Sequence, residues 1–305
     1  MATIELTLTV VSPTFMYGAY QRGSDTQPEM RAQSVRGQLR YWLRAILGAG
    51  TTELKQVWDA ESAVFGSTGM GSAVSVRVYP RHFEPERVPM MPHKSNPHDR
   101  KQSEAKAVPE NTRALLQLVT RPGVEMPADA LNALKVWSLL GGVGKRSRRM
   151  FGAVRVSSKD DAWYVTPATV EEFMELTATT LNAVIGAPPK RASIPDWPTL
   201  HPNHSWVVIG REHYDSAEEA NERLFRDLLR KGEYLNEDTS FGFAGGGGRR
   251  ASTLHAQVRR IGSVYYPVLT ALRSQPEQKI KWDVLARFMN EAKQHFNGET
   301  VWGDW

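Results

Sequence analysis

The sequence predicts an α+β fold made of two ferredoxin-like units with long loops and insertions. The 305 residues are 41 % hydrophobic and 23 % charged, which suits one large domain or two of ordinary size. In the first half, hydrophobic periods follow the order strand, helix, strand, strand, helix, strand, as in a split βαβ or ferredoxin-like unit. Helical and extended periods also alternate in the second half. We therefore expect domains at residues 1–158 and 159–305.

The first unit opens with a strand over residues 3–12, where Ile4, Leu6, Leu8 and Val10 alternate with polar residues. The later segments are, in order, a polar loop at 14–33, a helix capped by Ser34, a strand at 74–78, a long loop or mobile insertion at about 83–112, a strand at 113–120, a helix at 127–140 and a strand at 153–156.

The second half predicts a less regular unit of the same kind. Its helices are expected at about 167–186, 216–232 and 282–295, and its strands at 205–210, 251–260 and 263–268.

Composition narrows the class of protein. The absence of cysteine excludes disulfides, thiol nucleophiles and thiolate metal sites. A net charge of +5, from 38 basic and 33 acidic residues, favours an anionic partner only mildly, so the distribution of the charges has to decide. The sequence offers no apolar run of membrane-spanning length and no basic leader, so we expect a cytoplasmic protein without a membrane partner.

A stripe of arginines runs along the first predicted helix. Arg36, Arg40 and Arg44 are spaced by four residues, so they line one side, roughly 100° from the apolar side. Like charges in a row repel unless an anion neutralises them, and Arg31 adds a cation where the helix dipole disfavours it. Gly37 suggests that another backbone approaches the first turn. We predict that the stripe binds phosphate, and the alternative is a solvated basic face.

A glycine-rich loop follows the second predicted helix, reading GGVGKRSRRMFG over residues 141–152. It lacks the spacing of a Walker loop and of a dinucleotide fingerprint, and it leads from a helix into a strand, the reverse of both motifs. We predict instead a clamp for a phosphate backbone, with a helix cap beside a surface basic cluster as the alternative. The clamp residues are Gly141, Gly142, Gly144, Lys145, Arg146, Arg148 and Arg149.

A second stretch, FGFAGGGGRRAS at residues 241–252, again places aromatic residues and glycines before two arginines, Arg249 and Arg250. Aromatic side chains beside arginines suit single-stranded RNA, whose bases stack while its phosphates pair with the cations. We predict RNA contacts from a loop lying on the sheet, with a flexible linker as the alternative.

Several motifs together resemble one protein family. The stretches VSPTFMYGAY, RAQSVRGQLRYWLR, ESAVFGSTGMGSAVSVRV and LLGGVGKRSRRMFGAVRVSS are similar to those of the repeat-associated mysterious protein (RAMP) superfamily of CRISPR systems. Within it they most resemble the family of first-named subunits of the Cmr complex, the type III-B effector. The likeness spans roughly residues 4–158, with weaker support from RRASTLHAQV at 249–258.

The resemblance implies two RRM-like units in a non-catalytic subunit of a ribonucleoprotein that acts in antiviral defence. Such a subunit lies near the 3′ end of the guide RNA, contacts other RAMP subunits and helps to capture target RNA. The basic helix of the family maps to Arg36, Arg40 and Arg44, and its glycine-rich loop to Gly141, Gly142, Gly144, Arg146, Arg148, Arg149 and Gly152. Met150 stands where the family usually has a small residue.

Two other classes of function stay open. A metal-independent endoribonuclease of the same superfamily would need a general acid or base, for which His201, His204 and His255 are the candidates. A metal-dependent step would need more than the single carboxylate of Asp25, and the histidine pairs offer no third ligand for zinc. A protein-only adaptor is the remaining alternative. We expect no cofactor, no metal and no catalytic residue.

Overall fold

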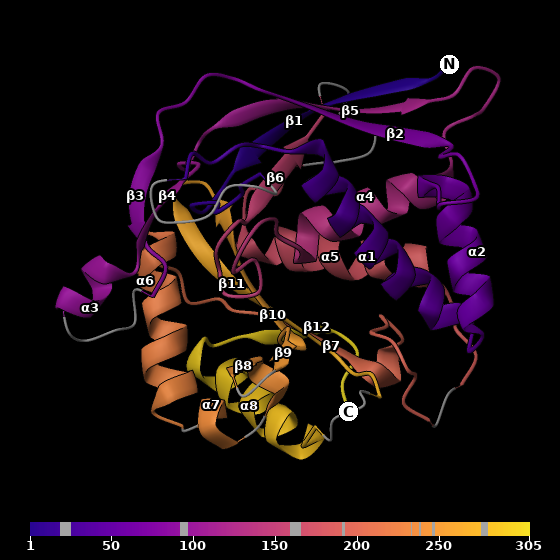
Figure 1. The fold of residues 1–305 in the computed structure, drawn as a ribbon. Helices are drawn as coiled ribbons and strands as arrows, with labels where there is room; N and C mark the ends of the chain where they lie inside the picture. Colours follow the sequence, from indigo (N-terminus) through magenta and orange to yellow (C-terminus); the bar gives the residue numbers. More distant parts are fainter. Residues whose placement is uncertain are drawn as a thin grey trace. The chain divides into compact units, whose positions relative to one another are not determined.

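The computed structural model describes residues 1–18, 26–91, 97–158, 166–190, 193–232, 234–237, 239–245, 248–275 and 280–305. The chain divides into two compact units, which are shown in Figure 1 and are described separately below. The first consists of Met1–Arg44 and Glu53–Thr166, and the second of Ala45–Thr52 and Pro167–Trp305. The domain limits predicted from the sequence stay a prediction.

The first unit contains a four-stranded antiparallel sheet with the order β2-β5-β1-β6. The strands are β1 (Thr3–Val10), β2 (Val74–Pro80), β5 (Arg113–Thr120) and β6 (Val154–Ser157). In the centre, Leu6 lies opposite Leu116 on β5, and Leu8 lies opposite Val156 on β6. Because side chains alternate between faces, these leucines share one face, and all of them are buried.

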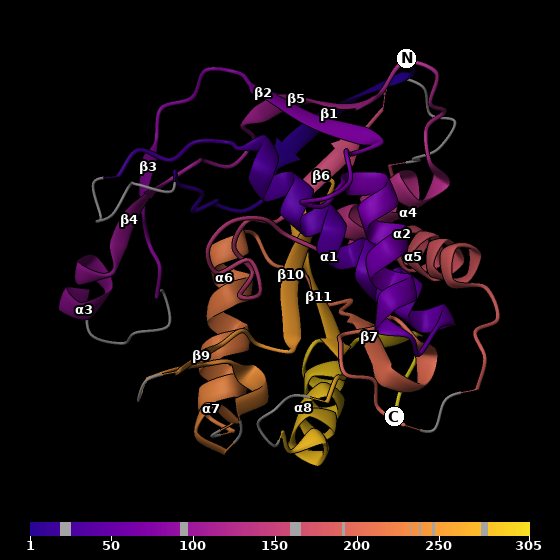
Figure 2. The same ribbon diagram turned by 45° about the vertical axis from the view of Figure 1, so that its right-hand side comes forward.

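Three helices cover that apolar face: α1 (Ala32–Gly50), α2 (Leu54–Phe65) and α4 (Ala128–Leu140). Figures 1 and 2 both show them on one side of the sheet. Leu39, Trp42 and Leu43 of α1 and Trp137 of α4 have no exposed surface. The apolar spacing that predicted α1 and α4 therefore identified the buried sides of these two helices correctly.

The start of α1 differs from the prediction. Ser34 was expected to cap it, but the helix begins at Ala32, and the carbonyl of Arg31 accepts bonds from the backbone N–H groups of Ser34 and Val35. Ser34 therefore lies inside the first turn. No described atom lies within 4 Å of where a Cβ of Gly37 would be, so the expected approach of another backbone stays a prediction.

The segment at 83–112 is not one long loop. It contains β3 (Glu86–Pro89), α3 (Pro97–Gln102) and β4 (Glu104–Ala107), and β3 and β4 pair as an antiparallel hairpin. Each strand has four residues, too few to produce a recognisable period. The hairpin has its own packing partners, because Ala105 and Ala107 form a buried cluster with Phe15 and Phe151.

The second unit repeats the topology of the first, with the sheet order β10-β11-β7-β12. Its strands are β7 (Ser205–Ile209), β10 (Leu254–Ile261), β11 (Val264–Leu272) and β12 (Glu299–Trp302). Its helices are α5 (Val170–Ile185), η1 (Pro202–His204), α6 (Ala217–Glu222), η2 (Arg223–Arg230), α7 (Tyr234–Glu237), η3 (Thr239–Phe241) and α8 (Trp282–His295). The prediction of two ferredoxin-like units is thus confirmed.

The stretch expected to be a loop on the sheet, or a linker, is instead a second hairpin. Strand β8 (Phe243–Gly245) pairs with β9 (Gly248–Arg250) as a separate two-stranded sheet. No helix that the structure describes is both long enough and apolar enough to cross a bilayer.

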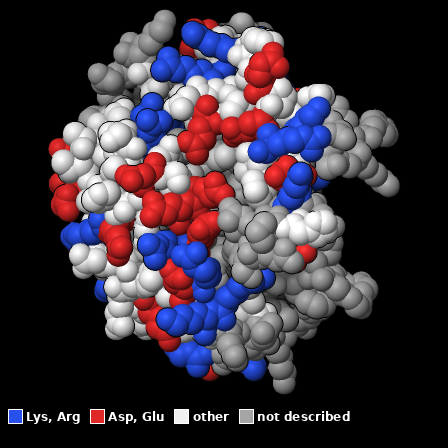
Figure 3. All heavy atoms as spheres, turned by 90° about the vertical axis from the view of Figure 1, so that its left-hand side faces the viewer, with Lys and Arg blue, Asp and Glu red and all other residues white. Residues whose placement is uncertain are grey.

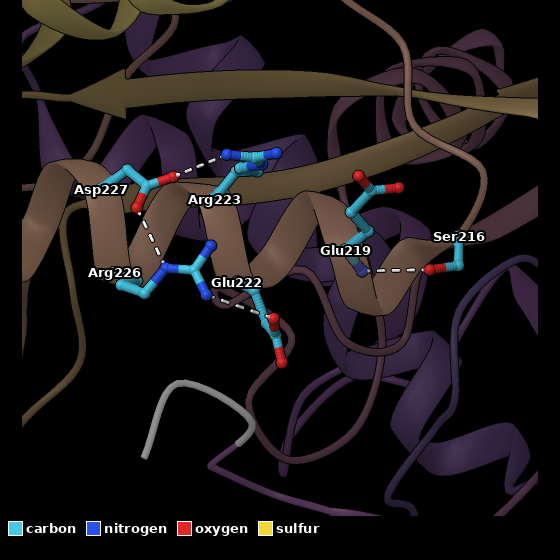
Figure 4. Close-up of polar contacts among 6 residues, drawn as sticks. All are labelled: Ser216, Glu219, Glu222, Arg223, Arg226 and Asp227. Carbon is cyan, nitrogen blue, oxygen red and sulfur yellow. Dashed lines mark hydrogen bonds and ion pairs between the residues drawn. The ribbon is translucent and has the colours of Figure 1, made fainter. Parts of the chain in front are cut away.

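Ion pairs along α6 and η2 are drawn in Figure 4. Ser216 caps α6 by accepting a bond from the backbone N–H of Glu219, at 3.1 Å. Further along, Asp227 lies 3.3 Å from Arg223 and 3.1 Å from Arg226. Burial alone would raise the pKa of Asp227, but hydrogen bonds from the two guanidinium groups lower it overall. These two arginines therefore have carboxylate partners on their own helix.

In the first unit, ion pairs hold α2 against α1. Glu61 of α2 has no exposed side-chain surface, and its carboxylate pairs with Arg40 and, at 3.4 Å, with Arg44. Arg36 donates to the carbonyl of Phe65, the last residue of α2. Because a buried carboxylate is stable only when it is paired, Glu61 fixes the position of α2 along the arginine stripe.

We expect Glu61→Gln to lower the free energy of unfolding by about 2 kcal/mol, because Arg40 and Arg44 lose their charged partner. The matched control is Asp59→Asn on the same helix, which breaks an exposed pair with Lys55 and should cost less than about 0.5 kcal/mol. Urea denaturation measures both changes. Equal midpoints for the two variants would contradict the role given to Glu61.

We expect Gly37→Ala to stabilise the protein by about 1 kcal/mol, because Gly37 is exposed in a helix and open space surrounds it. The control is Gly48→Ala on the same helix, where a Cβ would lie 2.3 Å from Nε1 of Trp197. Thermal unfolding should therefore shift in opposite directions for the two variants. A lower Tm for Gly37→Ala would show that something does approach this turn.

Candidate nucleic-acid interface

The predicted arginine stripe meets an anion of its own chain. Arg36 and Arg40 contact α2 through Phe65 and Glu61, and the side chain of Arg40 is only 25 % exposed. Arg44 keeps more accessible surface, at 45 %. We predicted a bound phosphate because the aligned arginines repel one another unless an anion neutralises them. Glu61 supplies part of that negative charge from within the chain. The RNA contacts of the stripe stay a prediction, and Arg44 is best placed to make one.

The glycine loop between α4 and β6 is closed by backbone bonds. Val143 donates to the carbonyl of Gly152 at 2.8 Å, Lys145 to that of Phe15 at 2.7 Å, and Gly152 to that of Pro13 at 3.0 Å. The loop therefore lies against the segment that follows β1.

The glycines of this loop are required by the packing of the protein itself. A Cβ at Gly141 would lie 2.4 Å from atoms of Trp42 and Trp137, and one at Gly152 would lie 1.9 Å from the carbonyl oxygen of Val143. Gly144 has φ +86° and its Cβ would meet the carbonyl of Phe15. The carbonyl of Gly142 accepts a bond from Trp137 Nε1 at 3.2 Å. An open glycine backbone facing a ligand, as predicted, is therefore not needed to explain these residues.

The β3–β4 hairpin, hereafter the insertion hairpin, also packs against the glycine loop. Thr14 exchanges backbone bonds with Val108, directly after β4. The rings of Phe15 and Phe151 pack 5.1 Å apart, and the hydroxyl of Tyr17 donates to the carbonyl of Lys106 at 2.5 Å. Three segments distant in sequence thus pack together at this loop.

The glycine loop carries four cations, Lys145, Arg146, Arg148 and Arg149. We call these four residues the basic loop. Arg146 has a left-handed backbone (φ 60°), and its carbonyl accepts a bond from the N–H of Arg149 at 2.8 Å. Such a conformation costs a non-glycine residue roughly 1–2 kcal/mol. Burial, and then the charges of Arg146 and Arg148, lower the pKa of Arg149 to about 10. Holding these guanidinium groups close together therefore lowers the stability of the folded chain.

Aromatic rings extend this cluster towards α1. The ammonium group of Lys145 lies 4.5 Å from the centre of the Tyr17 ring, and the guanidinium of Arg148 lies 5.1 Å from that of Tyr41. Burial raises the pKa of Tyr41, while Arg148 and Arg44 oppose the change. Tyr41 was not predicted as a site residue, although it stands beside the arginine stripe in the sequence.

Arg31 joins the same surface from the other end of the helix. Its Nη1 donates to the carbonyl of Tyr17 at 3.1 Å, and its Nε lies 3.2 Å from the carboxylate of Glu29. Of the predicted residues, Arg31 therefore lies at Tyr17 beside Lys145, while Arg36, Arg40 and Arg44 all contact α2.

Arg249 and Arg250 belong to β9 in the second unit, where their backbones pair with Ala244 and Phe243. Their RNA contacts stay a prediction. On the face drawn in Figure 3, described basic and acidic side chains are interspersed and neither sign prevails. Local arrangement, rather than net charge, therefore has to identify an interface.

The histidines considered for catalysis are buried. His201 has both ring nitrogens bonded to backbone, Nε2 to the carbonyl of Pro189 at 2.9 Å and Nδ1 to the N–H of Asn203 at 3.1 Å. His255 lies on β10 and is 3 % exposed. No three His, Asp or Glu side chains in the described ranges gather closely enough to hold a metal. Asp25 lies outside the described residues.

Comparisons with known proteins agree with this architecture. A family model described as the RAMP superfamily matches residues 7–155. The CRISPR system Cmr subunit Cmr1-1 of Pyrococcus furiosus is 27 % identical over 321 aligned residues, which cover 91 % of this chain and 92 % of that protein.

Solved structures share the fold. The crystal structure of apo Cmr1 from Pyrococcus furiosus aligns over 100 % of both chains with a TM-score of 0.69 and 24 % identity. A chain in the cryo-EM structure of type III-B Cmr-beta bound to cognate target RNA has a TM-score of 0.64 and 12 % identity, covering 96 % of this chain and 99 % of that one. The likeness to the first-named Cmr subunit, expected from the motifs, is confirmed. Residues 7–155 are therefore similar to the RAMP superfamily, and nearly the whole chain is similar to Cmr1 of Pyrococcus furiosus.

Proposed function

We propose that this protein is a non-catalytic, RNA-binding subunit of a type III-B CRISPR effector complex in the cytoplasm. It holds the guide RNA towards its 3′ end, contacts other RAMP subunits and helps to capture target RNA. The likeness to Cmr1 along nearly the whole chain supports its membership of such a complex. Sequence recognition then comes from pairing between guide and target, and this subunit supplies contacts to the RNA backbone.

The observation that carries the RNA-binding role is the crowding of cations in the basic loop. Burial, and then the charges of Arg146 and Arg148, lower the pKa of Arg149, so a largely buried guanidinium lies within the repulsion of two others. A phosphate group beside them would neutralise this repulsion and accept bidentate hydrogen bonds. The exposed Lys145 adds a further positive charge to this loop.

Crosslinking of the purified assembly, followed by sequencing of the RNA attached to this chain, tests the proposal. The variant is Arg148→Gln with Arg149→Gln. The control is Arg223→Gln with Arg226→Gln, which removes the same charge from arginines that already have carboxylate partners. We expect crosslinks to the guide 3′ end to disappear in the loop variant and to persist in the control.

Other outcomes select the alternatives. Equal crosslinking in both variants, with an assembly that is insensitive to salt and to removal of RNA, would favour a protein-only adaptor. RNA cleaved by the purified chain in the presence of a chelator would favour the metal-independent endoribonuclease and would overturn the non-catalytic role.

We further expect Arg149→Gln to raise the Tm of the RNA-free protein by roughly 3 °C while weakening RNA binding. The lowered pKa means that the folded protein holds this proton less tightly than the unfolded chain does. The charged side chain therefore costs stability below about pH 10, and this cost fades as the pH rises further. Stability gained and affinity lost in one variant would identify a binding residue. Arg226→Gln, which loses two carboxylate partners, should give no such gain.

A further inference from the structure

The sheet of the first unit has a second face that none of the helices α1, α2 and α4 covers (Figures 1 and 2). Its side chains alternate with the buried leucines along each strand. Tyr79 on β2 is 50 % exposed and Leu115 on β5 is 37 % exposed. The two lie opposite each other in the ladder, so an aromatic and an aliphatic side chain form an exposed pair in the sheet.

The strand register arranges this open face in rows that run across the sheet. The central row is Tyr79, Leu115, Thr7 and Ser157. Two residues along the strands, the next row is Arg81, Arg113, Thr9 and Arg155, in which Arg81 is joined to Arg113 by a backbone bond of 2.9 Å. On the other side of the central row lie Arg77, Gln117 and Glu5. Adjacent rows are roughly 7 Å apart.

The charge of this face is strongly positive. Arg77, Arg81 and Arg113 are exposed and Arg155 is half-buried. None of these four arginines pairs with a carboxylate in the part of the chain that the structure describes. Glu5 alone is acidic within the three rows, and it accepts a bond of 2.6 Å from Gln117. The arginines therefore remain available to an anionic partner.

We propose that this open sheet face binds a segment of single-stranded RNA, with a base stacked on Tyr79 and Leu115 and phosphates on the arginine row. Four arginines against one engaged carboxylate favour a polyanion, and an exposed ring between rows of cations suits a base beside its backbone. The inference rests on the proposed function, because it assumes that the chain binds RNA. It adds a second contact surface to the basic loop, on residues that were not predicted from the sequence as RNA-binding.

Binding of fluorescein-labelled oligouridine to the full chain tests this surface. We expect Tyr79→Ala to weaken binding roughly 10-fold and Tyr79→Phe to preserve it, because stacking needs the ring and not the hydroxyl. The matched control is Trp58→Ala on α2, which removes an aromatic ring of nearly equal exposure, 51 %. Arg113→Gln with Arg155→Gln should reduce the slope of log K against log salt by about 0.7 for each arginine. Circular dichroism checks that each variant is folded.

Each outcome bears on one proposal or on both. Equal affinities for Tyr79→Ala and Trp58→Ala would overturn the sheet surface, while a loss in the basic-loop variant would leave the proposed function intact. No binding of RNA by the unaltered chain or by its assembly would overturn both. If Tyr79→Ala kept its RNA affinity but released a neighbouring subunit from the assembly, the face would be a protein contact. Crosslinks from position 79 in assemblies with and without target would separate guide from target.

Discussion

Glu61 places a carboxylate inside the first unit, and the arrangement of α1 and α2 depends on it. A buried charge is tolerated only beside its counter-ions, so α2 has to lie where Arg40 and Arg44 can reach the carboxylate. The same contact determines which arginines of α1 are neutralised within the protein. Arg36, Arg40 and Arg44 all contact α2, but Arg44 keeps nearly half of its side chain in solvent.

The sequence predicted regular elements well because hydrophobic period is a local property. The alternation in β1, the four-residue spacing in α1 and the helices of the second unit all appear in the structure near the predicted positions. What it could not predict depends on contacts between distant segments. Glu61 lies 21 residues from Arg40, and nothing in the spacing of the arginines indicates that their anion is already in the chain.

In the candidate site, too, the sequence predicted local features and missed those that depend on distant contacts. The clustering of cations after α4 was visible in the sequence, but the role of the glycines was not, because it is set by Trp42, Phe15 and Val143 pressing on that backbone. Ser34 met the rule for a helix cap, yet the helix starts two residues earlier. The insertion hairpin was missed because its strands are short, and it proved to support the loop through Ala105 and Ala107.

The backbone bonds that close the glycine loop also affect how the loop can bind. Lys145 and Gly152 each donate a backbone hydrogen bond to the segment after β1, and Val143 donates one to Gly152. Folding has therefore already removed much of the conformational entropy of this loop. A ligand that arrives here has little ordering entropy left to overcome. Its association is then governed by electrostatic encounter rather than by a slow rearrangement of the loop, and its lifetime by how well it replaces the water around the guanidinium groups.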